Sequence, residues 1–486
     1  MDATQANLAL GAILFLIPLT MALIVPVYHK PTTAIAWLLL IAMFPVVGLV
    51  LYLIFGGTKL PEQRRAQQRR MDEWIAARVA EVRQSPGLAP YFNPPIPTSY
   101  QPFARLGAAL GSLPVCGGNE IALVAGQEAF LERLTADIDQ ARHYVHLEFF
   151  ALSCDDETEP VFAALERAVA RGVRVRVLMD HFGSMVYSTY KATRRRLTRA
   201  GIEHQLMLPI RLFDRDFSRF DLRNHRKLVV IDGAVGYTGS HNLIRRNYFR
   251  TDAVTYDDLA VRVVGPVVGE LQAVFVTDWH AETNVVLAPQ NSPELATGFV
   301  VGGKALAQIL PSGPGHASAN NLALFAALVH AAQRELVLIT PYFVPDESLL
   351  LALTTAARRG VDVTLINSAA SDQFLAYHAQ RSYYAELLAA GVKIRLYEPP
   401  VLLHVKTIRV DDEIAVIGSS NLDIRSFQLN LEITMVVPDR DSVADLRRVE
   451  ALYLQRCSVL DQKVWLSRSW FTWMKENVAR LTSALQ

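Results

Sequence analysis

A duplicated motif constrains the fold of this 486-residue chain more than any other feature. The first copy consists of His225, Lys227, Asp232 and the segment Gly-Ser-His-Asn at 239–242. The second copy consists of His404, Lys406, Asp411 and the segment Gly-Ser-Ser-Asn at 418–421. The spacing from His to Lys, to Asp and on to the Gly-Ser segment is identical in the two copies. This repetition predicts two similar halves whose motifs meet at one site.

Each motif is expected to begin on a strand that ends in a tight turn. In the first copy, Leu228–Ile231 is apolar and β-branched, and Asp232-Gly233 is a turn signal. Alternation along a strand directs the His and Lys side chains to the same face. An imidazole beside an ammonium group suits a phosphate, because the Lys neutralises charge and the His can attack phosphorus or move a proton. The hydroxyls and amides of the trailing segments offer further phosphate-binding or supporting groups: Ser240, Asn242, Ser419 and Asn421.

Two equivalent histidines at one phosphate require opposite protonation states. One must be neutral to attack phosphorus, and the other must be protonated to release the alkoxide. The motif pair therefore predicts a ping-pong phosphodiester transfer through a phosphohistidine, with a bell-shaped pH profile.

The segments before the two motifs alternate in the same order between helix and strand. The first half is expected to have a helix at 127–142, a strand at 144–150, a helix at 159–171, a strand at 173–180 and a helix at 191–200. The second half is expected to have a helix at 322–334, a strand at 336–343, a helix at 349–359, a strand at 361–366 and a helix at 382–390. This order predicts an α/β fold of two α/β/α domains related by a pseudo-twofold axis.

The N-terminus carries most of the excess apolar residues. Leu8–Val27 and Thr33–Phe55 are each long enough to cross a bilayer, and we expect them to form a two-helix transmembrane hairpin. A cleaved signal peptide is the alternative for the first run. The basic residues that follow place the termini and the catalytic part in the cytoplasm: Lys59, Arg64, Arg65, Arg69 and Arg70. The same residues suit either anionic headgroups or a solvated helix.

The expected organisation has four parts: the hairpin (1–57), a basic juxtamembrane segment and linker (58–115) and the two catalytic domains (116–290 and 291–486). A net charge of +1 argues against a protein that grips nucleic acid. The three cysteines lack metal-binding spacing, so we expect reduced thiols and no metal site. The aromatic stretch Ser469–Lys475 is expected to pack in the core, with contact to a membrane interface as the alternative.

The motifs, together with Arg223-Asn224-His225-Arg226-Lys227, Thr340–Pro345 and Asn421–Phe427, resemble those of bacterial cardiolipin synthases of the phospholipase D superfamily. The resemblance extends over nearly the whole chain. It implies two phospholipase D-like domains, no cofactor and no metal, and a multi-pass protein of the bacterial inner membrane. It also implies that one phosphatidylglycerol donates its phosphatidyl group to a second, giving cardiolipin and glycerol.

The same resemblance assigns roles to individual residues. His225 is the expected nucleophile and His404 the general acid and then base, with the reverse assignment open. Lys227 and Lys406 are expected to stabilise charge on the phosphate. Glu432 and Asp258 are expected to hold the histidines, with Asp257 as an alternative to Asp258. Asp232 and Asp411 complete the catalytic motifs, and we expect them to shape the turns.

Four other functions remain open at this point. A membrane-anchored phospholipase D hydrolase or another phosphatidyltransferase would use the same residues. A nuclease of the same superfamily is disfavoured by the near-neutral charge and the apolar N-terminus. A non-catalytic membrane scaffold is disfavoured because both motifs are intact. Sequence does not decide whether the protein forms a homo-oligomer.

Overall fold

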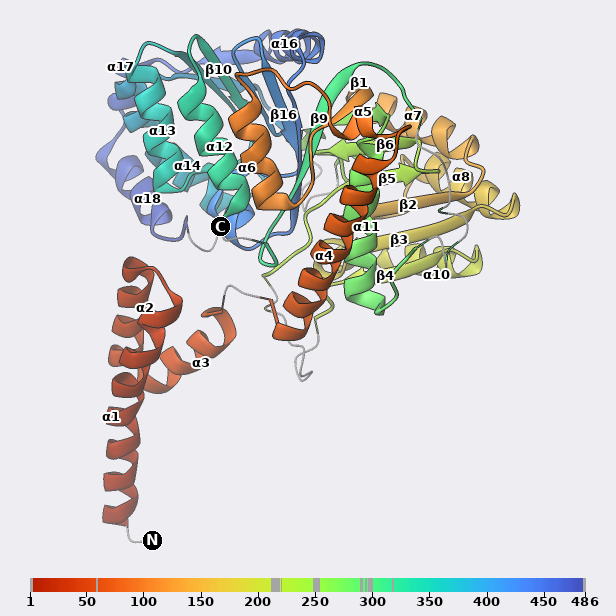
Figure 1. Ribbon diagram of the computed structural model, residues 1–486. Helices are drawn as coiled ribbons and strands as arrows, with labels where there is room; N and C mark the ends of the chain where they lie inside the picture. Colours follow the sequence, from red (N-terminus) through yellow and green to blue (C-terminus); the bar gives the residue numbers. More distant parts are fainter. Residues whose placement is uncertain are drawn as a thin grey trace.

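A single fifteen-stranded sheet runs through both halves of the chain (Figure 1). The computed structural model describes residues 3–57, 60–210, 219, 221–247, 254–288, 292, 295, 300–316 and 319–483. Lys59 and the expected domain boundary at residue 290 lie outside the described residues. From the centre outwards, the first half supplies β1 (Cys116–Ala125), β8 (Leu259–Val264), β6 (Val235–Gly239), β5 (Leu228–Ile231), β2 (Tyr144–Phe149), β3 (Arg174–Asp180) and β4 (Glu203–Met207). The second half supplies β9 (Ala305–Ser312), β18 (Glu432–Val437), β16 (Ile414–Gly418), β15 (Thr407–Val410), β10 (Glu335–Ile339), β12 (Asp362–Ser368), β13 (Lys393–Tyr397) and the edge strand β19 (Cys457–Val459).

The two halves of the sheet repeat the same strand pattern on either side of the β1–β9 pair. In the first half β2, β3 and β4 are parallel, and β5 joins them antiparallel to β2. In the second half β10, β12 and β13 are parallel, and β15 joins them antiparallel to β10. Antiparallel β1 and β9 meet at the centre, where Asn119 lies opposite Ala305. The sheet therefore has the pseudo-twofold arrangement that the duplicated motif predicts.

Helices cover both faces of the sheet and bury its alternating apolar side chains. In the first half, α7 (Gln127–Asp139) and α8 (Glu159–Ala170) pack on the face that carries Val145 and Leu147. The opposite face packs against α11 (Val268–Thr283), and its core continues without a break to α16 (Arg440–Leu454) of the second half. The second half is covered on its other face by α12 (Asn320–Ala331), α13 (Glu347–Arg358) and α14 (Phe374–Ala390). The shared core ties the halves together through apolar burial.

Most of the elements expected from the helix and strand patterns are present within a few residues of their expected bounds. The expected strand at 336–343 is shorter: it ends at Ile339, and a separate short strand follows at β11 (Phe343–Val344). The expected helix at 382–390 is longer and begins at Phe374. The remaining short elements of the body are α9 (His181–Met185), α10 (Tyr190–Arg199), β7 (Thr255–Asp257), β14 (Val401–Leu403), β17 (Leu422–Asp423), α15 (Ile424–Gln428) and α17 (Gln462–Leu466).

The N-terminal residues form three helices, so the expectation of a two-helix hairpin is wrong in its helix count. These helices are α1 (Ala3–Tyr28), α2 (Pro31–Met43) and α3 (Pro45–Phe55). The second apolar run is broken at Phe44, whose φ of −136° and ψ of 74° are not helical. A residue before proline avoids the helical region, and Pro45 has no N–H to continue the hydrogen bonding. Among the described residues, no helix combines the length and the apolar character needed to cross a membrane.

The segment between the N-terminal helices and the sheet packs on the body. α4 (Glu62–Gln84) buries Met71 and Ile75 in the core beside α11, and Arg64 pairs with Glu282 at 2.7 Å. After the short α5 (Ala89–Phe92), α6 (Gln101–Gly111) packs against β9 and α12 of the second half.

The C-terminal aromatic stretch lies on the surface, so its expected burial in the core is wrong. It forms α18 (Trp470–Arg480), which packs on α14 through the buried residues Glu476 and Ala479. Trp470, Phe471 and Trp473 are more than half exposed. Glu476 and Ala479 are three positions apart and so lie on one side of the helix, which faces the body, while the three aromatic residues lie outside that side.

Candidate active site

The two motif aspartates fix the turns that follow β5 and β15. Asp232 accepts hydrogen bonds from the backbone N–H groups of Arg142, His143 and Tyr144 at 2.7–2.8 Å. Asp411 repeats this with Gln333, Arg334 and Glu335 at 2.8–3.0 Å. Both aspartates have positive φ, 52° and 50°, a conformation in which Asp is favoured over most residues. The two aspartates therefore shape the turns of the motifs and join each turn to the start of the neighbouring strand.

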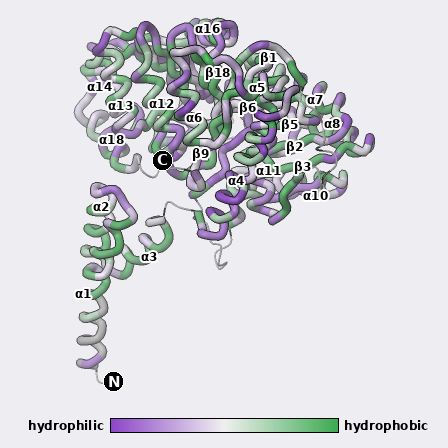
Figure 2. Tube along the Cα trace, viewed as in Figure 1, coloured by the Kyte–Doolittle hydropathy of each residue, from purple (hydrophilic) through white to green (hydrophobic). Residues whose placement is uncertain are grey.

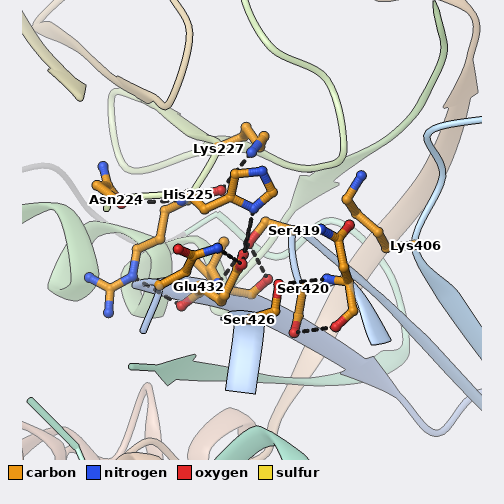
Figure 3. Close-up of polar contacts among 12 residues, drawn as sticks. Asn224, His225, Lys227, Lys406, Ser419, Ser420, Ser426 and Glu432 are labelled. Carbon is orange, nitrogen blue, oxygen red and sulfur yellow. Dashed lines mark hydrogen bonds and ion pairs between the residues drawn. The ribbon is translucent and has the colours of Figure 1, made fainter. Parts of the chain in front are cut away.

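The first motif histidine is positioned by a segment of the second half. Asn224 forms a parallel bridge with Leu431, and the His225 backbone N–H donates to the Leu431 carbonyl at 2.8 Å. The next residue, Glu432, therefore projects beside the imidazole. His225 Nδ1 lies 3.0 Å from both carboxylate oxygens of Glu432 (Figure 3). Asn430 and Ser419 also donate to this carboxylate, which fixes its orientation.

The second motif histidine is positioned by the first half in the same way. β14 pairs in parallel with β7, and the His404 backbone N–H donates to the Asp257 carbonyl at 2.7 Å. The next residue, Asp258, projects beside the ring, and its Oδ1 lies 2.8 Å from His404 Nδ1. The Asp257 side chain instead accepts from Tyr397 at 3.1 Å. The structure thus places Asp258, rather than the alternative Asp257, against the histidine.

The acid–histidine pairs are exchanged between the halves. The carboxylate that follows the second motif holds the histidine of the first, and the carboxylate that follows the first motif holds the histidine of the second. Sequence identified both carboxylates but did not state which histidine each one serves. The signal lies in long-range pairing of short segments, namely Asn224 with Leu431 and β14 with β7, and these pairings leave little local trace in the sequence. Neither half supplies the carboxylate that its own histidine contacts.

The motif lysines lie at the end of the same extended segments and reach the centre of the site. Lys227 Nζ donates to the His225 carbonyl at 2.7 Å, and Lys406 makes the same bond to the His404 carbonyl. Figure 3 shows Lys227 and Lys406 gathered around His225 and the residues that hold it. Burial, with a further contribution from the charge of Lys406 and against the opposing effect of Glu432, lowers the pKa of Lys227 to about 7. Burial likewise lowers the pKa of Lys406 to about 8. The charge of Lys406 in the second half therefore affects the pKa of Lys227 in the first half.

The histidines are buried and neutral at neutral pH. Burial lowers the pKa of His225 to about 4, with Glu432 raising it and Lys227 lowering it. Burial lowers the pKa of His404 to about 4 as well, with Lys406 lowering it and Asp258 raising it. Although burial alone would raise the pKa of Glu432, its bond to His225 and the nearby Lys227 bring it below the ordinary value. With Nδ1 held by an ionised carboxylate, Nε2 is the nitrogen of each ring that can act on phosphorus.

The hydroxyls and amides of the trailing segments support the site unequally. Ser419 donates to Glu432, whereas the Ser240 hydroxyl accepts from the Leu259 backbone N–H at 2.9 Å. Asn242 Oδ1 accepts from the Ala151 backbone N–H at 3.3 Å. Asn421 Oδ1 is buried and has no hydrogen-bond partner among the described residues. The Asn421 oxygen therefore has unused acceptor capacity inside the site.

Two groups of residues near the site were not singled out from the sequence. Arg226 is fully buried; it pairs with Asp278 and its Nε donates to the Glu432 carbonyl at 3.0 Å. Phe150 and Tyr256 place their rings 5.2 and 5.5 Å from the rings of His225 and His404. Arg226 lies between His225 and Lys227 in the motif, and this position was the sequence signal that could have identified it as a residue near the site. Tyr256 lies two residues before Asp258, but its side-chain contact depends on the same exchanged pairing.

Comparisons with known proteins agree with this geometry. A family model described as cardiolipin synthase, PLD-like domain matches residues 134–279 and 325–450, and a phospholipase D-nuclease N-terminal model matches residues 10–57. Cardiolipin synthase A of Proteus mirabilis is 34% identical over 461 residues, 94% of each chain. The Yersinia pseudotuberculosis protein of the same name is 35% identical over 446 residues, 90% of this chain and 89% of that one.

A solved structure shares the fold. The phosphatidylserine synthase of Haemophilus influenzae superposes with a TM-score of 0.58 at 15% identity, over 79% of this chain and all of that one. The matches cover both halves and, with the two complete motifs and their exchanged carboxylates, leave one assignment. The chain belongs to the cardiolipin synthase family of the phospholipase D superfamily.

Proposed function

We propose that this enzyme transfers a phosphatidyl group between two phosphatidylglycerol molecules through a phosphohistidine, giving cardiolipin and glycerol. The observation that carries the proposal is the pair of buried imidazoles, each held at Nδ1 by a carboxylate of the other half. The family membership supports the phosphatidyltransferase reaction and its lipid substrate. Other phospholipid acceptors would be served by the same residues.

In the first step, neutral His225 attacks the phosphorus of one phosphatidylglycerol through Nε2. The P–O bond to the glycerol headgroup breaks, and His404, protonated in the substrate complex, gives that oxygen its proton. The phosphate carries a negative charge into a site whose two lysines lower the pKa of both histidines. This charge offsets the lysines and favours protonation of His404, which explains how a ring that is neutral in the free enzyme becomes an acid.

In the second step, a headgroup hydroxyl of another phosphatidylglycerol replaces the released glycerol. His404 removes its proton, the oxygen attacks phosphorus, and the bond to His225 breaks to release cardiolipin. Lys227 and Lys406 stabilise the charge on the non-bridging oxygens in both steps, assisted by the side-chain N–H groups of Asn242 and Asn421. Ser240 and Ser419 act through the segments that hold Asp258 and Glu432. One phosphodiester is exchanged for another, so the reaction needs no nucleotide.

We also propose that residues 1–57 attach the enzyme to the bacterial inner membrane, with the two catalytic domains on the cytoplasmic side. The apolar side chains on α1–α3 support this, because many of them are exposed, among them Leu23, Val27, Leu39 and Leu53. The tube in Figure 2 is predominantly hydrophobic over these helices. The arginines of α4 that follow, including Arg69 and Arg70, suit the cytoplasmic face.

A lipid product assay tests the proposal. Purified enzyme is incubated with phosphatidylglycerol as the sole lipid substrate, and lipids and free glycerol are quantified by mass spectrometry. The expected result is one cardiolipin for each glycerol released, with none from a His225→Ala control. Phosphatidic acid as the main product would instead identify a hydrolase.

A further inference from the structure

Exposed apolar side chains gather at equivalent places in the two halves, at the carboxyl ends of the parallel strands. In the first half they stand on α9, which follows β3 directly. In the second half they stand at the start of α14, which follows β12. We call this set the site rim; it consists of Phe182, Met185, Val186, Phe374 and Leu375, each exposed by at least 42%.

The site rim is joined to the catalytic residues by short contacts. Asp180, which caps α9, accepts from the Asn224 backbone N–H at 2.9 Å, one residue before His225. Asp372, two residues before Phe374, accepts from the Tyr256 hydroxyl at 2.8 Å, and the Tyr256 ring contacts His404. Burial and then Asp372 raise the pKa of Tyr187, which follows Val186. The two parts of the site rim therefore lie on the same side of the molecule, around the catalytic centre.

The outer face of α18 continues the site rim. Its inner face is anchored by Glu476, which is buried and pairs with Arg381 at 3.0 Å and Arg468 at 2.8 Å. The outer face exposes Trp470, Phe471, Trp473 and Val478. Lys475 extends from this helix to within 5.9 Å of the Phe374 ring. The apolar surface thus runs from the catalytic centre onto a helix whose largest side chains have no cover in the described part of the chain.

Cations flank the apolar surface on both sides. On the side of the second half, Lys475 is exposed beside Phe374. On the side of the first half, α10 exposes Lys191, Arg195 and Arg199, and its first residue, Tyr190, contacts the His181 ring of α9. Apolar residues in the centre with Trp and basic residues at the margin form the pattern that binds the interface of an anionic bilayer.

The N-terminal helices reach the body on this same side. Lys30, between α1 and α2, lies 3.7 Å from Asp346, which caps α13 just after β11. Arg219, close to the first motif in sequence, donates to the Gly57 carbonyl at 2.8 Å. In Figure 1, α18 lies on the part of the body nearest to α2. The apolar helices and the site rim are therefore placed to meet one lipid surface.

We propose that the site rim and the outer face of α18 form a docking surface for a lipid bilayer that contains anionic lipid, so that the catalytic centre opens onto the membrane. The identity of the lipid that reaches the catalytic centre from this surface rests on the proposed function. Lipid headgroups then reach the histidines without leaving the bilayer, and the acyl chains stay among the apolar side chains of the rim. The partner is the bilayer itself, not a second copy of this chain.

The test compares a bilayer substrate with a dissolved one. Full-length enzyme is placed in phosphatidylcholine vesicles and supplied either with long-chain phosphatidylglycerol in the same vesicles or with short-chain phosphatidylglycerol as monomers. The variant W470S/F471S/W473S is compared with a matched control, L351S/L452S, whose residues are 63% and 60% exposed on α13 and α16. We expect a loss of about tenfold or more on the bilayer substrate for the variant alone, since lipid contact of several large apolar side chains is removed. On the monomers both proteins stay within about twofold of the unsubstituted enzyme.

A direct readout accompanies the kinetics. Brominated lipids should quench the fluorescence of Trp470 and Trp473, because those rings lie in the interface. The quenched part of the signal should be absent from W470F/W473F, which lacks both rings. Equal losses on both substrates, no loss on the bilayer, or a variant whose oligomeric mass changes would each overturn the proposal. If the unsubstituted enzyme forms no cardiolipin from either substrate, the proposed function fails, and the quenching still decides the docking surface.

Discussion

The two motif histidines each contact a carboxylate of the other half, but the two carboxylates have unequal support. His225 faces both oxygens of Glu432, which is also bonded by Ser419 and Asn430. His404 faces one oxygen of Asp258. The two motifs thus present the same chemical groups, and the carboxylate that faces His225 has the more extensive hydrogen-bond network. A ring held in one orientation keeps its Nε2 directed at the reacting phosphorus, which agrees with the proposed role of His225.

The residue between His and Lys also differs between the two motifs, and again the first motif has more hydrogen bonds. In the first motif it is Arg226, which reaches Asp278 of α11 and the Glu432 carbonyl. In the second it is Val405, which is fully buried in the apolar core. The first motif is therefore held by a charge pair within its own half and by a hydrogen bond to the other half, and the second by packing. Each of the following changes acts on one side of this comparison.

Replacing either histidine has the largest expected effect. His225→Ala and His404→Ala should each lower kcat by roughly 10⁴-fold or more, as loss of a nucleophile or its proton-transfer partner does elsewhere. Cardiolipin formation from phosphatidylglycerol measures it. Mixing the two inactive chains should restore nothing, because each chain carries both halves of its own site. Recovered activity in the mixture would show that two chains share a site.

Removing the charge that holds each histidine comes next. Glu432→Gln and Asp258→Asn should each lower kcat by about 10²- to 10⁴-fold with little change in KM, because the ring loses its orientation and the stabilisation of its charged form. The better-bonded Glu432 should show the larger loss. Steady-state kinetics on both variants settle the order, and a greater loss for Asp258→Asn would reverse the comparison.

The third change separates charge from packing. Arg226→Met leaves Asp278 buried without its partner and should cost about 3–5 kcal/mol of stability. Val405→Ala should cost about 1–3 kcal/mol, as a small core truncation. Thermal or denaturant unfolding of the purified variants gives the two values. The double variant R226M/D278L should recover part of the loss, and no recovery would argue against the pair as the cause.

The smallest expected effects are in the pH dependence of kcat/KM, which reports the free enzyme. His225 must be neutral and His404 must bring a proton, and the pKa of both rings is about 4 in the free enzyme, so kcat/KM should rise to about pH 4 and fall above it. The lysines must also be charged, so this fall should steepen as the pH increases through about 7 for Lys227 and about 8 for Lys406. Lys227→Arg should move the point of steepening towards about 8, and Lys406→Arg should leave it near 7. A steepening that neither variant moves would exclude the lysines as its origin.

Sequence predicted the features that depend on local pattern. The alternation of Val145 and Leu147 with polar neighbours gave β2, and the Asp-Gly turn gave the end of β5. The pairing of Glu432 with His225 escaped prediction because a bridge between residues over two hundred positions apart decides it. The break at Phe44 was visible as Pro45, but the apolar character of the run outweighed it. The exposure of Trp470 was missed because an aromatic cluster has the same composition in a core and on a surface.

Trapping the covalent intermediate tests the central claim most directly. A phosphatidyl ester of p-nitrophenol needs no acid to release its leaving group. His225 of a His404→Ala enzyme should therefore still attack the phosphorus of this ester and release p-nitrophenolate, but the enzyme should be slow to pass the phosphatidyl group on. Mass spectrometry of the protein is expected to show a phosphatidyl adduct on His225 and none in a His225→Ala enzyme. An adduct on His404 of the His225→Ala enzyme, with none on His225, would contradict the assignment. No adduct in either protein would contradict a phosphohistidine altogether.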